Sequence, residues 1–202
     1  QKRMLSIISG AILPLVALGF IKSLVDYIKP EKESTEDTIK NEVSIEAPVE
    51  KFENYQLHIE WRSPMEPDTK KSQGKGNSGV FMQGMYEVQV MNSYQNRTYR
   101  NGQAGSIYKQ SAPLVNATSK MGEWNTYDII YTAPKFTING GIDTPAYVTV
   151  IHNGVVVQNH TKIQGTTEYI GQPKNPVHGP GPISLQDHGN QVSFRNIWIR
   201  EM

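Results

Sequence analysis

The chain has 202 residues, of which 37% are hydrophobic and 19% are charged, with 17 glycines and 12 prolines. This composition is typical of one folded domain with a short appended segment, not of a disordered chain. The 20 Lys and Arg residues nearly balance the 19 Asp and Glu residues, and the net charge of +1 argues against a nucleic-acid-binding surface. Cysteine is absent, which excludes disulfides, cysteine-ligated metals and thiol catalysis.

The N-terminal segment is apolar. Residues 4–21 form an uncharged run that follows the basic pair Lys2–Arg3. As a helix this run would be roughly 27 Å long, close to the ~30 Å thickness of the hydrocarbon core of a membrane. We therefore expect residues 1–29 to form an apolar helix that serves as an export signal or, because no small-residue cleavage site follows it, as a membrane anchor. The alternative is a helix packed on the core, since Ile21, Leu24, Val25 and Ile28 share one helical face.

Residues 30–50 are acidic and poor in large apolar side chains, and they contain the helix-breaking residues Pro30 and Pro48. Such a composition predicts a solvated linker. Within it, Glu42–Ala47 alternates enough to suggest a strand.

Residues 51–202 have the pattern of an all-β domain. Short segments rich in β-branched and aromatic residues alternate with turn residues, and no long amphipathic helix is expected. Asn153–Gly154 lies between two β-branched runs and predicts a two-residue hairpin. Many short antiparallel strands indicate a sandwich or a barrel. The expected strands are 55–62, 79–83, 86–91, 126–132, 146–152, 155–160, 182–186 and 192–200.

Alternation along these strands predicts one apolar and one polar face. In 55–62, Leu57, Ile59 and Trp61 oppose Gln56, His58, Glu60 and Arg62. In 86–91, Tyr86, Val88 and Val90 oppose Glu87 and Gln89, and in 183–186 Ile183 and Leu185 oppose Ser184 and Gln186. In the last strand, the same rule places Phe194, Asn196, Trp198 and Arg200 opposite Arg195, Ile197 and Ile199.

The polar faces carry planar hydrogen-bonding groups that suit a hydroxyl-rich ligand. We expect alternate side chains of neighbouring strands to converge on one hollow that binds a sugar. The simpler interpretation is that residues such as Glu60 and Arg62 pair with charges on neighbouring strands. The scattered histidines and the absence of phosphate-loop, nucleophile-elbow and zinc-helix motifs give no other chemical signature.

Several segments resemble the 3-keto-disaccharide hydrolase domain family. They include FENYQLHIEWRSP (52–64), GNSGVFMQGMYEVQVMNSY (76–94), GQAGSIYKQSAPLVNATSKMGEWNTYDIIYTAP (102–134), VTVIHNGVVVQNH (148–160) and GPISLQDHGNQVSFRNIWIREM (181–202). The resemblance covers roughly residues 50–202. It implies a concanavalin A-like jelly roll of two antiparallel sheets over 51–202, and an exported, carbohydrate-active protein.

The family's chemistry implies a C3 ketone that acidifies the C2 hydrogen of a glycosyl unit. A general base removes that proton, donors stabilise the enolate, and an acid helps the C1 substituent to leave before water adds. By residue type, we assign Glu87 and His188 as base and acid in either order, and Arg62 as the enolate stabiliser. Contacts to the sugar are expected from six further residues: Glu60, Asn77, Gln89, Tyr108, Gln186 and Asp187.

Two departures from the family pattern stand out. Family members usually carry Asp where this chain has Asn92, and they have further strands ahead of the segment that matches 52–64. No cofactor is expected; calcium is common in such folds, and Asp128, Asp143 or Asp187 are possible oxygen ligands without forming a specific motif.

The expected ligand is an oligosaccharide or 3-keto-sugar, without nucleic acid. We expect an exported protein, periplasmic or extracellular, with possible membrane association through residues 4–21. Because one fold serves many functions, two alternatives to an enzyme remain. One is a membrane-anchored, non-catalytic carbohydrate-binding module, and the other is a structural domain at the cell surface.

Overall fold

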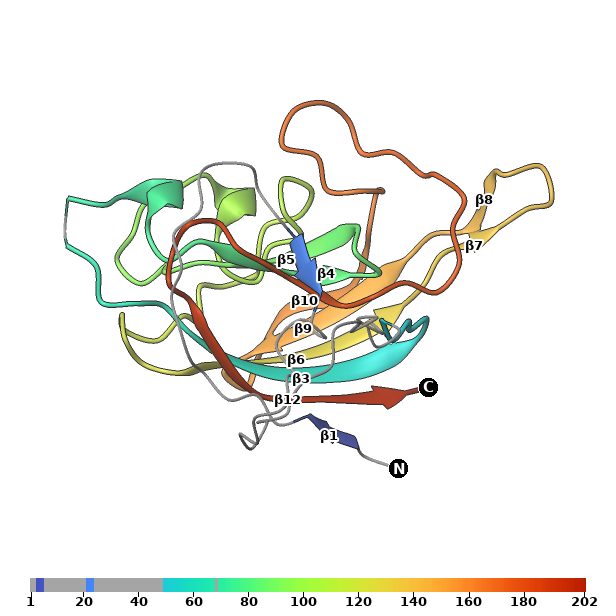
Figure 1. Cartoon of the computed structure of the whole chain (residues 1–202). Coiled ribbons are helices and arrows are strands. Elements are labelled where there is room, and N and C mark those ends of the chain that lie inside the picture. Colours follow the sequence, from blue (N-terminus) through green and yellow to red (C-terminus); the bar gives the residue numbers. More distant parts are fainter. Residues whose placement is uncertain (1–2, 6–20, 24–48, 68) are drawn as a thin grey trace, which may run out of the picture.

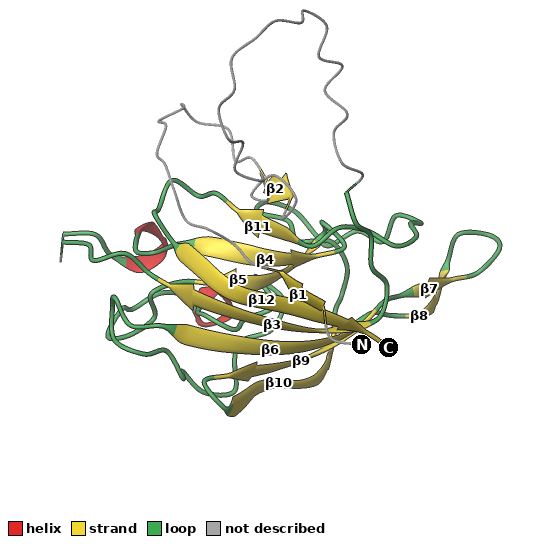
Figure 2. Cartoon of the chain, turned by 60° about the horizontal axis from the view of Figure 1, so that its bottom comes forward, coloured by secondary structure: helices red, strands yellow, loops and turns green. Residues whose placement is uncertain are grey.

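The computed structural model describes residues 3–5, 21–23, 49–67 and 69–202 as an all-β structure (Figures 1 and 2). The larger sheet has the order β1-β12-β3-β6-β9-β10. Its strands are β1 (Arg3–Leu5), β12 (Ser193–Glu201), β3 (Tyr55–Arg62), β6 (Asn125–Thr132), β9 (Tyr147–His152) and β10 (Val155–Lys162). The second sheet has the order β2-β11-β4-β5. It consists of β2 (Ile21–Ser23), β11 (Ser184–Gln186), β4 (Ser78–Met82) and β5 (Tyr86–Val90).

Three smaller elements complete the described structure. The strands β7 (Lys135–Phe136) and β8 (Ile142–Thr144) form a ribbon that projects from the domain, as Figures 1 and 2 show. The one-turn 3₁₀ helices are η2 (Ser72–Gly74) and η3 (Arg100–Gly102). The long connection between β10 and β11, residues 163–183, has no regular secondary structure.

The two larger sheets pack face to face on a common apolar core. Leu57 and Ile59 of β3 and Ile129 of β6 belong to the same buried cluster as Val80 of β4 and Val88 of β5. All strand pairs are antiparallel, so the two-sheet β-sandwich expected from the sequence is confirmed. The finer assignment as a concanavalin A-like jelly roll stays a prediction.

Most strands of residues 51–202 lie where the period-two pattern predicts them, although β7 and β8 were not predicted. Along β3 the side chains alternate between buried and partly exposed, because apolar residues at every second position face the core. The Asn153–Gly154 hairpin is also confirmed: the two residues have φ values of 50° and 79°, and Val155 pairs with His152. Positive φ at both central residues is what a tight hairpin turn requires.

Near the N-terminus, the six described residues form edge strands. β1 pairs with β12, with Met4 opposite Trp198, and β2 pairs with β11, with Lys22 opposite Leu185. For Arg3–Leu5 and Ile21–Ser23 the prediction of a helix over 1–29 is therefore wrong. The physical reason is that each segment supplies hydrogen bonds to a sheet edge that would otherwise expose backbone groups.

The rest of that predicted helix lies outside the described residues, as do the Glu42–Ala47 strand and nearly all of the predicted linker. Among the residues that the structure describes, no helix is long and apolar enough to cross a membrane.

A β-bulge in β12 overturns the alternation predicted for the last strand. Arg195 pairs with Glu60 and Trp198 pairs with His58, so β12 has an extra residue in this interval. Asn196 lies in it with φ of 48°. Since a bulge reverses the direction of the side chains that follow, Arg195 and Trp198 share the outer face while Phe194 packs on the core. The predicted face of Phe194, Asn196, Trp198 and Arg200 is thus wrong.

Buried tyrosines connect the two sheets through their hydroxyl groups. Tyr131 of β6 donates to Gln83 Oε1 at 2.6 Å, and Tyr127 donates to the Gln89 carbonyl at 2.7 Å. The hydroxyl of Tyr55, also fully buried, has no hydrogen-bond partner in the described part of the chain.

These contacts predict opposite effects for two otherwise identical substitutions. Tyr131→Phe leaves the buried Gln83 oxygen unpaired and should lower the free energy of unfolding by about 1–3 kcal/mol. Tyr55→Phe removes an unpaired buried hydroxyl and should be neutral or stabilising. Urea denaturation of both variants measures the difference, and equal losses of stability would contradict the assignment.

Candidate active site

The outer face of the four-stranded sheet carries the candidate site. Tyr86, Val88 and Val90 of β5 face the core, so alternation directs Glu87 and Gln89 to the opposite side. The sequence predicted this division, but it also suggested an open polar face. All five residues of β5 are instead buried.

Glu87 is a buried carboxyl group without a compensating charge. Its exposed fraction is 2%, and its side chain makes no hydrogen bond or ion pair in the described part of the chain. Burial disfavours the ionised carboxylate and raises the pKa of Glu87 to about 8. A carboxyl group with this pKa is available near neutral pH both as a base and as an acid.

Gly79 of β4 makes room for this carboxyl. A Cβ atom at position 79 would lie 2.6 Å from Glu87 Oε1 and 2.9 Å from its Cγ. Glu87 is paired with Phe81, and its side chain lies diagonally over Gly79, in a space that no other residue type leaves open. Only a glycine at position 79 permits this close approach.

Two connections cover the free edge of β5 and hold its backbone. The Glu87 N–H donates to Thr167 Oγ1 at 3.0 Å, and the Glu87 carbonyl accepts from the Tyr108 N–H at 3.2 Å. The 163–183 connection, orange in Figure 1, is also attached through His178, whose Nε2 lies 2.7 Å from the Tyr86 hydroxyl. These contacts place two loops beside Glu87.

A buried amide network lies on the same face. Gln89 Nε2 donates to Asn77 Oδ1 at 2.9 Å, and Asn77 Nδ2 donates to the Gln73 carbonyl at 2.9 Å. Gln73 Nε2 in turn donates to Thr98 Oγ1 and to the Gly102 carbonyl, each at 2.8 Å. Asn77 and Gln89 thus use most of their polar atoms within the protein, although the buried Gln89 Oε1 has no partner.

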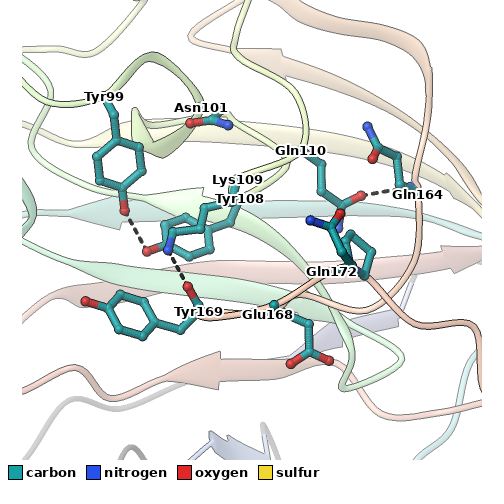
Figure 3. A pocket seen from close by; sticks show the side chains of 11 residues that line it. Tyr99, Asn101, Tyr108, Lys109, Gln110, Gln164, Glu168, Tyr169 and Gln172 are labelled. Atoms are coloured by element: carbon teal, nitrogen blue, oxygen red, sulfur yellow. Dashed lines mark hydrogen bonds between the residues drawn. The ribbon is translucent and has the colours of Figure 1, made fainter.

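Next to β5 the two loops enclose an open depression of about 570 Å³ (Figure 3). Its walls combine aromatic rings with amides. The lining includes the side chains of Tyr99, Tyr108, Lys109, Gln110, Glu168 and Tyr169. The Tyr99 and Tyr108 hydroxyls are 2.6 Å apart and form a hydrogen bond.

The tyrosine pair is close to Glu87. Burial is the main cause of the raised pKa values of Tyr99 and Tyr108, and the negative charge of Glu87 adds to both shifts. Both phenols therefore keep their protons over the whole physiological pH range and act as hydrogen-bond donors. Because the pair uses one of its two hydroxyl hydrogens internally, one hydrogen remains for a water or a ligand.

The structure separates two of the predicted site residues from the others. Glu60 and Arg62 lie on the outer face of the six-stranded sheet, opposite in direction to Ile59 and Trp61 of the core. Glu60 accepts from Arg195 Nε at 2.6 Å and from Asn196 Nδ2 at 2.9 Å.

The two arginines of this face also contact one aromatic ring. The guanidinium groups of Arg62 and Arg195 lie 4.8 and 3.9 Å from the centre of the Trp124 ring. The expectation that all candidate residues converge on one hollow is wrong, because the sandwich core lies between Glu60 and Glu87. Glu60 instead follows the simpler interpretation, pairing with a charge on the neighbouring strand.

The remaining predicted residues lie on or near the four-stranded sheet. Gln186 is partly exposed at the end of β11, and Asp187 and His188 are exposed in the turn that follows. Asp187 Oδ1 accepts from the Gly189 N–H at 3.0 Å. No hydrogen bond or ion pair joins His188 to Glu87 in the described residues, and their roles stay predictions.

Asn92, where family members usually carry Asp, is buried just after β5. Its Oδ1 accepts from the Tyr94 N–H at 3.2 Å, and its Nδ2 has no partner within the described residues. The side chain therefore stabilises a turn.

The aspartates considered for calcium belong to three separate places. Asp128 binds His58 Nδ1 at 2.8 Å on the outer face of the six-stranded sheet, Asp143 belongs to the projecting ribbon, and Asp187 lies after β11. No group of three or more His, Asp or Glu side chains able to hold a metal occurs over residues 49–67 and 69–202. These aspartates do not fit a shared calcium site.

Sequence reasoning missed Tyr99, Lys109, Glu168 and Tyr169. They lie in connections without periodicity, so alternation could not place them. One usable signal was the length of the 163–183 connection, since long irregular loops in compact domains are often functional.

The raised pKa of Glu87 predicts a pH-dependent stability. Between the usual pKa of 4.5 and about 8, the folded protein holds a proton that the unfolded chain releases. The stabilisation is complete below pH 4.5 and is lost as the pH rises through 8, at up to about 1.4 kcal/mol per pH unit. Glu87→Gln should therefore gain stability relative to the wild type between pH 5 and pH 8 in urea denaturation.

Glu60→Gln is the matched control for this measurement. Partial burial raises the pKa of Glu60, but hydrogen bonds from Asn196 and Arg195, with the charge of Arg195, outweigh it and lower the pKa below 4.5. Its stability difference from the wild type should stay constant from pH 5 to pH 8. A constant difference for Glu87→Gln as well would show that Glu87 ionises normally.

Comparisons with known proteins agree with this architecture. A solved structure from Parabacteroides distasonis ATCC 8503, described as a candidate glycosyl hydrolase, shares 62% sequence identity with a TM-score of 0.73. The match covers 76% of this chain and 66% of the other, so this chain spans just under two thirds of that protein. No curated protein matched the chain.

Two further candidate glycosyl hydrolase structures from the same organism share the fold. Their identities are 21% and 20% and their TM-scores 0.50 and 0.51; each match covers 76% of this chain, and 80% and 74% of the other chains. Residues 28–200 match the 3-keto-alpha-glucoside-1,2-lyase-like domain, a span that begins ahead of the predicted boundary at residue 51. The chain therefore belongs to the family of 3-keto-alpha-glucoside-1,2-lyase-like domains.

Proposed function

We propose that the chain is a carbohydrate-active enzyme that cleaves the glycosidic bond of 3-keto-glycosides by elimination, followed by addition of water. The observation that carries the proposal is Glu87, a buried carboxyl with a pKa of about 8 and no counter-ion in the described residues. Glu87 is not itself in the lining of the depression, but its carbonyl accepts from the N–H of Tyr108, which is. Perturbed carboxyl groups next to polar pockets are typical of proton-transfer sites. Family membership supports the same substrate class.

In the proposed reaction, the Glu87 carboxylate removes the hydrogen on C2, and the electron pair of the C–H bond moves into an enolate on the C3 oxygen. The enolate then restores the C3 ketone, a double bond forms between C1 and C2, and the C1–O bond breaks. Water adds its hydroxyl to C1 and its hydrogen to C2. The net result is hydrolysis, and a carboxylate whose conjugate acid has a pKa near 8 is a stronger base than an ordinary one.

The developing charge on the C3 oxygen needs a donor. Arg62, expected in this role from the sequence, lies on the opposite side of the sandwich from Glu87. The Tyr99–Tyr108 pair is better situated, since it lies near Glu87 and has a hydroxyl hydrogen that the pair does not use. When one tyrosine hydroxyl donates to the other, the accepting hydroxyl is polarised. Its own hydrogen bond to an anion then becomes stronger.

Glu87→Gln tests the base. The amide keeps the size of the side chain but cannot accept the proton, so cleavage of a 3-keto-glucoside should fall by about 10²-fold or more. Exchange of the C2 hydrogen in D₂O, followed by NMR, should fall equally, and wild-type kcat/KM should rise with pH towards about 8. Glu201→Gln, at an exposed carboxylate on β12, serves as the control with unchanged rates. Full activity of Glu87→Gln would refute the proposal, and sugar binding without any cleavage by the wild type would favour a binding module.

His188→Ala tests the acid separately. We assign His188 to protonate the leaving oxygen, a step that follows removal of the C2 proton. The variant should lose about 10²-fold in cleavage of an alkyl glycoside while C2 exchange continues. A nitrophenyl leaving group, which needs no proton, should restore most of the rate. Parallel losses of exchange and cleavage would exclude this role.

A further inference from the structure

Lys109 has an unusual backbone conformation at the edge of the depression. Its φ of 58° lies in the left-handed region, which residues with a Cβ rarely adopt. Its N–H donates to the Asn101 carbonyl at 2.8 Å, which holds the loop in this conformation. Figure 3 shows the result: the Lys109 side chain lies between Tyr108 and Tyr169. Strain maintained in this way indicates that the position of the side chain matters.

The Lys109 ammonium group is held in place without being neutralised. It lies 4.2 Å from the centre of the Tyr169 ring and 5.8 Å from that of Tyr108, and it donates to the Tyr169 carbonyl (Figure 3). Ring faces attract a cation but carry no net charge. Of three ammonium hydrogens, the Tyr169 carbonyl uses one, so two remain for a ligand.

The charged side chains that line the depression, once Lys174 is counted against Glu168, leave an excess of one positive charge. Glu168 is the other charged residue of its lining in the described chain. Its Oε1 accepts from Thr166 Oγ1 at 2.9 Å and lies 3.7 Å from Lys174 Nζ, so Lys174 balances it. Lys109 forms no ion pair with any described residue.

We propose that this depression is a subsite for a sugar unit that bears a carboxylate, with Lys109 as the residue that binds the anion. The inference rests on the proposed function, in which the depression would receive the sugar that leaves C1. The Gln164 and Gln172 side chains and the fixed amide of Gln110, which donates to the Gly165 carbonyl at 2.9 Å, border the site. Neutral donors and acceptors beside one cation match an acidic sugar better than a free inorganic anion.

The test compares binding of two disaccharides that the enzyme cannot cleave because neither has a C3 ketone. One is methyl β-cellobioside, and the other is its analogue with a carboxylate at C6 of the reducing-side unit. By isothermal titration calorimetry on the whole chain, the acidic analogue should bind about five-fold more tightly or better. This advantage should shrink as salt is added, because screening weakens the attraction between exposed charges.

Three lysine variants identify the residue responsible. Lys109→Met should abolish the preference for the acidic disaccharide, and Lys109→Arg should keep it. Lys135→Met, which removes the same charge from β7, should also keep it. Circular dichroism establishes that each variant is folded. Equal affinities in the wild type, an unchanged preference in Lys109→Met, or acetate binding as tightly as the acidic disaccharide would each overturn the inference.

These outcomes are independent of those that test the function. Binding of the acidic disaccharide through Lys109 in a protein that does not cleave 3-keto-glycosides would refute the elimination mechanism and support the subsite. Cleavage by a wild type without the preference would refute the subsite and support the mechanism.

Discussion

The shared core between the two sheets is the constraint on which the rest of the structure depends. Alternate residues of β3 and β6 pack against alternate residues of β4 and β5, and the Tyr127 and Tyr131 hydroxyls bond across the interface. Each polar residue that alternates with this core must point outward. Glu87 therefore lies on the outer face of one sheet and Glu60 on the outer face of the other.

The two carboxyl groups illustrate how different surroundings shift the pKa of one residue type in opposite directions. Glu60 is bound by Arg195 and Asn196, so its charge is stabilised and its pKa lowered, with partial burial opposing the shift. Glu87 is buried without such partners, and its charged form is disfavoured. A carboxylate paired with a cation keeps its charge at a surface, whereas a buried carboxyl without a counter-charge costs stability when it ionises.

The loops give the candidate site its remaining chemistry. The free edge of β5 exposes backbone groups, and Thr167 and Tyr108 satisfy them. The same two segments carry the Tyr99–Tyr108 pair, Lys109 and Tyr169, which line the depression. The same two segments therefore cover an edge strand and form the polar depression.

The sequence by itself determined most strands of residues 51–202, the apolar faces of all but the last of them, the Asn153–Gly154 hairpin and the family, because period-two patterns and turn residues are local properties of the chain. It also placed Glu87 and Gln89 together on the side of one strand that faces away from the core. Only the tertiary structure decided that Arg62 and Glu60 lie across the core from them, that the bulge at Asn196 turns Arg195 outward, and that Lys109 meets Tyr169. These positions depend on how the two sheets stack and on where irregular loops contact a strand edge. Neither the stacking nor the loop contacts produce a periodic pattern in the sequence.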